Sequence, residues 1–232
     1  MNWEEFNYYL WADGDFNFLW IIVIAVLVFF GTQFLKWSKT IDLKTTKRLY
    51  FGFGFFFLGY AVCRLFFLFS NYYYEYGMEA TLAFQLHTRL AYVSGIFSIG
   101  FFLYGLEMNF LNTKGIITLI AAAHGVLTLV LPSYDTLRYI TYWTNPVYFV
   151  VTMALYFYIA AKSTGSIRRN AFRSIIGLFI FFAGIFLDSR MFKILFTDMG
   201  IRWIPFLVPP ICLVSGLAYF YIANKLSNRD LN

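Results

Sequence analysis

The chain has 232 residues, of which 60% are hydrophobic, 23% aromatic and only 13% charged, and its net charge is +6. A soluble domain carries about 25% charged residues, and a globule of this size could not hide so much apolar side chain from water. The composition therefore excludes a soluble enzyme, a nucleic-acid-binding protein and a disordered chain, and it indicates an integral membrane protein.

Seven stretches are apolar enough and long enough to cross a bilayer, which takes roughly 17–25 residues in a helix. None alternates as the strands of a transmembrane barrel do, so we expect helices. The sequence predicts an all-α membrane protein with one seven-helix domain over residues 1–232 and spans at 16–35, 49–70, 86–104, 115–131, 142–161, 171–187 and 204–222.

Basic residues are distributed unevenly between the two ends of these spans. Twelve lie in alternate connections and the tail, whereas the opposite connections hold four, and Arg64 and Arg89 lie within spans. Because cytoplasmic loops are enriched in Lys and Arg, we expect a multi-pass protein of the plasma membrane with its N-terminus outside and its C-terminus inside. The basic inner surface also suits anionic lipid headgroups of the bilayer.

Two shorter elements are expected on the outer side. Trp3, Phe6 and Leu10 share one face of an N-terminal helix that would lie in the interface. The connection from Asp188 to Trp203 mixes apolar and charged residues as an amphipathic element does. Both fit an aromatic belt at headgroup level, and the alternative is a lid over an outward pocket.

The second and sixth spans carry matching residues 125 positions apart. Arg48, Gly52, Phe56, Phe57 and Gly59 correspond to Arg173, Gly177, Phe181, Phe182 and Gly184. This match favours a 3+1+3 repeat with the fourth helix as linker, an arrangement found in small sugar transporters. The alternative is chance similarity, because phenylalanine is so abundant here.

Ionisable residues within the spans gather at the outer ends, where they form the candidate ligand-binding site: Arg64, His87, Arg89, Asp188 and Arg190. Such residues are costly in a membrane, so the simplest pairing sets Asp188 against Arg64 or Arg89. Two arginines and one aspartate leave a positive charge that suits a small anionic or carboxylate-bearing ligand. The alternative is a structural clamp between helices with arginines reaching the interface.

Other polar features of the spans suggest no chemistry. His124 stands alone in the fourth span, and with only one other histidine we expect no metal and no cofactor; a haem held by both is the alternative. Nucleophile–base pairs, phosphate loops and paired carboxylates are absent from the sequence, so we expect no enzyme. Pro209 and Pro210 free backbone carbonyls in the last span and are a candidate hinge.

Three sequence blocks carry a family resemblance. They are Lys44 to Tyr50 running into a Gly- and Phe-rich span with Arg64 to Phe67 near its end, Glu107 to Lys114, and Ser163 to Arg169 leading through Gly177 and Gly184 to Leu187–Ser189. Together they resemble uncharacterised archaeal seven-helix proteins, especially of the Asgard group. They are more distantly similar to the seven-helix sensor regions ahead of histidine kinases, although the kinase segment is missing.

The expected function is that of a seven-helix receptor or sensor. Its outer polar cluster would sense a small ligand, and its basic inner loops would contact a separate protein partner, since the chain stops about ten residues after the last span. The alternatives are a small-solute transporter with two three-helix repeats and a structural subunit of a larger membrane complex. The sequence has none of the Pro-Gln pairs that are typical of sugar transporters.

Overall fold

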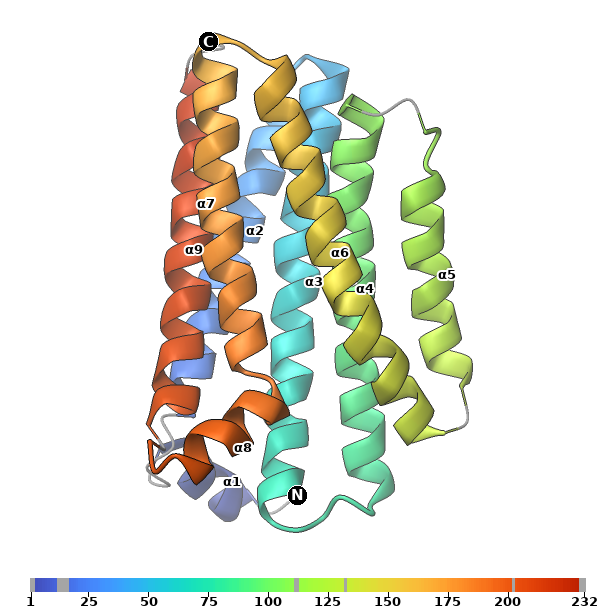
Figure 1. Ribbon diagram of the computed structural model, residues 1–232, viewed down its shortest axis with the longest axis vertical. Helices are drawn as coiled ribbons and strands as arrows, with labels where there is room; N and C mark the ends of the chain where they lie inside the picture. The colour runs from blue at the N-terminus through green and yellow to red at the C-terminus, as the bar shows by residue number, and fades with distance from the viewer. Residues whose placement is uncertain (1–2, 12–16, 111–112, 132, 202, 230–232) are drawn as a thin grey trace. The chain divides into compact units, whose positions relative to one another are not determined.

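The computed structural model describes residues 3–11, 17–110, 113–131, 133–201 and 203–229, and these residues form helices without a strand. The long helices are α2 (Phe18–Thr40), α3 (Lys44–Glu75), α4 (Leu82–Phe110), α6 (Tyr134–Lys162), α7 (Gly165–Leu187) and α9 (Ile204–Arg229). Figure 1 shows them as long rods, which agrees with the helical membrane protein that the sequence predicts.

Six of these helices are long and apolar enough to cross a membrane. The predicted fourth span is α5 (Ile116–Val130), which has only 15 residues. At 1.5 Å per residue this helix is about 22 Å long, less than the roughly 30 Å of hydrocarbon in a bilayer. The structure therefore confirms six membrane-length helices and corrects the length of the seventh.

The observed helices extend beyond most of the predicted spans. α3 continues for five residues on either side of 49–70, and α4 begins at Leu82 and ends at Phe110 rather than covering 86–104. Hydropathy marks the part of a helix that fits hydrocarbon, but the backbone hydrogen bonds continue into polar turns. Two short helices, α1 (Trp3–Trp11) and α8 (Arg190–Asp198), confirm the elements expected near the N-terminus and after Asp188.

The chain divides into two compact units, one of residues 24–148 and the other of residues 1–23 with 149–232. In the first unit α3 and α4 run side by side, and α5 packs on α4 (Figure 1). Aromatic residues fill its core: Phe34 stacks on Phe57 with ring centroids 5.4 Å apart, and Phe53 stacks on Phe102 at 5.3 Å. In the second unit α7 and α9 form the corresponding close pair.

Glycines set how closely these pairs approach. A Cβ at Gly52 of α3 would lie 2.6 Å from the Phe101 carbonyl oxygen of α4, and one at Gly177 of α7 would lie 2.8 Å from the Gly216 carbonyl oxygen of α9. Side chains cannot fit at such distances. Small residues thus allow backbone-to-backbone packing, as is usual between membrane helices.

Candidate functional site

Arg64 lies in the middle of α3 and is buried, with 5% of its surface exposed. Its guanidinium carbon is 5.8 Å from the ring centroids of Tyr60 and Phe67, one turn away on either side. Aromatic faces attract a cation, and the effect is larger where water is excluded. Arg64 is therefore held within its own helix at least in part by these two rings.

His87 points from α4 toward aromatic residues of α3. Its ring centroid is 5.5 Å from those of Phe69 and Tyr73 and 6.1 Å from that of Phe66. Nδ1 donates to the Ala83 carbonyl oxygen at 2.6 Å. One residue further along, the Thr88 hydroxyl lies 2.5 Å from that of Ser70 and links the same two helices.

Arg89 faces a different neighbour. Its Nη1 donates to the Leu129 carbonyl oxygen at 3.0 Å, near the C-terminus of α5. The last carbonyls of a helix have no partner within the helix, and the C-terminal end of the helix dipole is negative, so a cation is favourable there. His87 and Arg89 thus lie two residues apart but serve separate contacts.

At the N-terminus of α5 a carboxylate, Glu107, binds the free backbone N–H groups, as Arg89 binds a carbonyl at the C-terminus. Glu107 is not among the predicted site residues. Its side chain is fully buried, at 0% exposure, near the end of α4. Oε1 accepts from the Thr113 hydroxyl at 2.5 Å and the Ile117 N–H at 3.0 Å, and Oε2 accepts from the N–H and the hydroxyl of Thr118 at 3.0 and 2.8 Å. The carboxylate therefore caps the N-terminus of α5 from a neighbouring helix.

The two charges form a bracket around α5, which we call the α4–α5 bracket and define as Arg89, Glu107 and the α5 groups they bind. Arg89 and Glu107 are eighteen residues apart, about five turns of helix, so they project from one face of α4. Each sign matches the helix end that it meets. A short helix in a membrane needs such partners, because an unsatisfied backbone group in lipid costs several kcal/mol.

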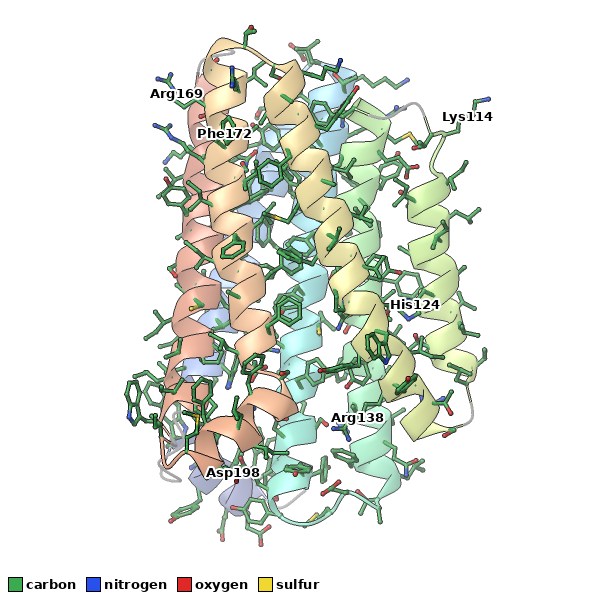
Figure 2. All side chains as sticks on the ribbon, viewed as in Figure 1. Lys114, His124, Arg138, Arg169, Phe172 and Asp198 are labelled. Atoms are coloured by element: carbon green, nitrogen blue, oxygen red, sulfur yellow. The ribbon has the colours of Figure 1, made fainter. Side chains whose placement is uncertain are left out.

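His124 is buried between the ends of this bracket (Figure 2). Its Nδ1 lies 3.0 Å from the Tyr148 hydroxyl, and the two rings stack with centroids 5.9 Å apart. Among the described residues no group of three or more His, Cys, Asp and Glu side chains could hold a metal ion. His124 is thus a hydrogen-bonded link between α5 and α6.

Asp188 follows α7 in the other unit. Its Oδ1 is 3.1 Å from Nζ of Lys193 in α8, and Lys193 also lies 5.8 Å from the centroid of the Phe206 ring. Lys193 is not among the predicted site residues, and its spacing of five residues from Asp188 is not one that pairs side chains on a helix; the contact depends on the turn between α7 and α8. The predicted pairing of Asp188 with Arg64 or Arg89 stays a prediction, and the side chain of Arg190 lies outside the described residues.

The candidate hinge residues Pro209 and Pro210 lie inside α9, and the helix continues through them. A Cβ at Gly184 of α7 would be 3.0 Å from the Pro209 carbonyl oxygen, so α7 packs tightly against this segment. Hinge motion here stays a prediction.

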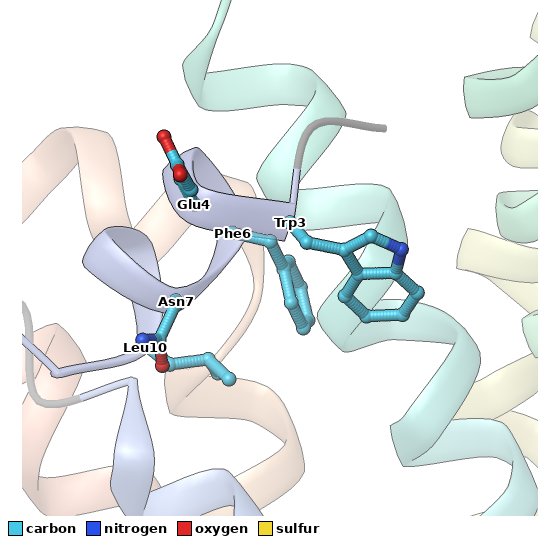
Figure 3. Close-up of a pocket in the computed structure, with 5 residues that line it drawn as sticks. All are labelled: Trp3, Glu4, Phe6, Asn7 and Leu10. Carbon is cyan, nitrogen blue, oxygen red and sulfur yellow. The ribbon is translucent and has the colours of Figure 1, made fainter.

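The described residues that line one hollow all belong to α1 (Figure 3). Trp3, Glu4, Phe6, Asn7 and Leu10 line it, and its volume is about 380 Å³. None of the predicted ligand-binding residues is among these lining residues. The hollow gives no support to a lid over an outer pocket.

No protein-family model matches the chain, and neither a curated protein nor a solved structure is significantly similar to it. The resemblance to archaeal seven-helix proteins and to kinase sensor regions therefore stays a prediction.

Proposed function

We propose that this protein is a non-enzymatic seven-helix receptor or sensor of the plasma membrane, with its N-terminus outside and its C-terminus inside. Its outer end would respond to a small anionic ligand, and its inner end would contact a separate protein. The observation that supports this proposal is the α4–α5 bracket, since it connects a half-buried arginine near one end of α5 to the connection at the other end.

Arg89 can form stronger hydrogen bonds with a carboxylate ligand than with the Leu129 carbonyl. A guanidinium has five N–H donors in a fork that matches a carboxylate with two parallel bonds, whereas the neutral Leu129 carbonyl accepts a single one. A bound carboxylate would draw Arg89 from Leu129 and remove the positive charge from the C-terminus of α5. The ligand would thereby favour an arrangement in which α5 is released at that end.

Release of α5 at its C-terminus would alter the connection at its N-terminus, where a partner protein could bind. Glu107 ties Thr113 and the first turn of α5 together, next to the exposed Lys114. Lys114 and Gly115 both have positive φ, at 53° and 89°, so this connection is tightly folded. A shift of α5 along α4 would strain these bonds and alter the connection.

We expect Arg89→Gln to raise amide hydrogen exchange at both ends of α5, around Leu129–Leu131 and around 113–118. Faster exchange at Leu129–Leu131 follows from the lost cap. Faster exchange at 113–118 follows only if α5 moves as a rigid body. Hydrogen–deuterium exchange followed by mass spectrometry on the purified protein measures both segments. Succinate, as a simple dicarboxylate probe, should cause the same change in the wild-type protein and none in the variant.

Arg138→Gln is the matched control, because Arg138 is a half-buried arginine of α6 that makes no hydrogen bond or ion pair within the described part of the chain (Figure 2). It should leave exchange in α5 unchanged. A rise confined to Leu129–Leu131 in Arg89→Gln would contradict transmission through α5. A missing succinate response would contradict a carboxylate site at Arg89.

A second candidate function, the transporter with a 3+1+3 repeat, is favoured by a different observation. Gly52 and Gly59 approach the backbone of α4 at Phe101 and Ser94, and Gly177 and Gly184 approach that of α9 at Gly216 and Pro209. The two glycines of α7 lie 125 positions after those of α3. The residues of α9 that they approach lie 115 positions after the corresponding residues of α4. Both helix pairs thus pack antiparallel through glycines seven residues apart, as two copies of one unit would.

Solute flux decides between the two functions. Liposomes that contain the purified protein should release or accumulate small radiolabelled sugars or carboxylates if the repeats form a transporter. Binding of succinate without any flux would favour the sensor and contradict the transporter.

A further inference from the structure

The surface between α6 and α7 carries a groove made only of apolar side chains. It has a volume of about 380 Å³ and is lined by Phe149, Met153, Phe157, Ile175, Ile176, Phe179 and Ile180. Three of them, Phe157, Ile176 and Phe179, are 51%, 48% and 59% exposed. A groove of this chemistry on a membrane-length helix pair is suited to hydrocarbon rather than to water.

Two arginines, Arg168 and Arg169, lie in the first two turns of α7, N-terminal to the residues of this helix that line the groove; Figure 2 labels Arg169. Arg168, Ile175 and Phe179 follow one another at intervals of seven and four residues, and so do Arg169, Ile176 and Ile180. These intervals place each arginine above its apolar residues on one face of the helix. Each arginine therefore lies N-terminal to two apolar groove residues on the same face of α7.

The charge of these arginines is not neutralised by the surrounding chain. Arg168 and Arg169 are exposed and make no hydrogen bond or ion pair within the described residues, and Arg168 only lies over the Phe172 ring at 5.8 Å. The sequence contains no Asp or Glu between Asp135 and Asp188, which covers nearly all of α6 and the whole of α7. An external anion would therefore meet an uncompensated positive charge at this end of the described helices.

We propose that this groove is a binding site for an anionic phospholipid, whose phosphate headgroup lies at Arg168 and Arg169 and whose acyl chain fills the space between α6 and α7. The eleven helical steps from Arg169 to Ile180 span about 16 Å, close to one leaflet, which is half of the roughly 30 Å of hydrocarbon. Basic pockets between membrane helices are typical sites for anionic headgroups. A second copy of the chain would bring its own α6 and α7, which carry the same positive charge and no acid to pair with it.

Lipid retention tests the site directly. Native mass spectrometry of the detergent-purified protein, titrated with phosphatidylglycerol or with phosphatidylcholine of the same acyl chains, should show preferential retention of phosphatidylglycerol. The double variant Arg168→Gln/Arg169→Gln should weaken phosphatidylglycerol binding by about thirtyfold, because each basic residue near an anionic headgroup contributes roughly fivefold. Both residues are exposed, so the variant should fold normally.

The matched control is Lys44→Gln/Lys47→Gln, which removes two exposed charges from the start of α3, neither of which belongs to the helices that form the groove. It should leave binding close to that of the wild-type protein. Ile176→Trp fills the groove and should reduce retention while the preference for phosphatidylglycerol over the neutral lipid persists. Equal losses in the two double variants, or a change of oligomeric mass instead of lipid retention in Ile176→Trp, would overturn the proposal.

Discussion

Replacing Glu107 with glutamine should lower the thermal stability of the protein more than any other single exchange of a charged residue. The carboxylate accepts four hydrogen bonds from Thr113, Ile117 and Thr118 while fully buried. An amide nitrogen in place of one oxygen would face two donors and accept from neither. Hydrogen bonds to a charged group contribute about 1.5–3 kcal/mol each, so we expect a loss of about 3–5 kcal/mol.

The transition is measured by fluorescence-detected unfolding in detergent, where a loss of this size shifts the midpoint by many degrees. Glu79→Gln is the control, because Glu79 is exposed and lies in the connection between α3 and α4. It should unfold with the wild-type midpoint. If Glu107→Gln behaved like Glu79→Gln, the N-terminus of α5 would not need its cap, and Glu107 would not be part of a functional α4–α5 bracket.

The helical class and the position of the six long helices could be predicted from the sequence, because hydrocarbon requires continuous apolar runs. The ends of the helices could not be predicted in this way. α3 reaches back to Lys44 and α4 forward to Phe110 through residues that a hydropathy window excludes. The length of α5 was overestimated because Gly115 and Leu131 are apolar, whereas the backbone leaves the helical region at both residues.

The candidate site was predictable in part, since burial of charge identified Arg64 and Arg89 as special. Their contacts depend on which helix faces each residue, and that is a property of packing rather than of spacing. Glu107 was overlooked because it lies beyond the predicted end of its span. One signal was available: Arg89 and Glu107 have opposite charges and are separated by eighteen residues, a whole number of helical turns.

Alanine at Gly52 or at Gly177 should destabilise the protein by about 2–3 kcal/mol, with similar losses at the two positions. The added Cβ would lie 2.6 Å from the Phe101 carbonyl oxygen in the first case, and 2.7 Å from the Phe220 nitrogen in the second. Backbone atoms cannot turn away as a side chain does, so the paired helices must separate and lose contact along their length. Unfolding in detergent measures the loss.

Gly100→Ala separates this packing effect from the general effect of alanine in a helix. Gly100 lies in α4, and a Cβ there would meet only the Cβ of Ala121 at 3.5 Å, an ordinary contact. Because alanine favours a helix over glycine by about 1 kcal/mol, this control should be neutral or slightly stabilising. The repeat adds a stricter requirement, since corresponding glycines in α3 and α7 should respond alike. Tolerance of alanine at one of the two positions, with a large loss at the other, would show that the two helix pairs are not built on the same register.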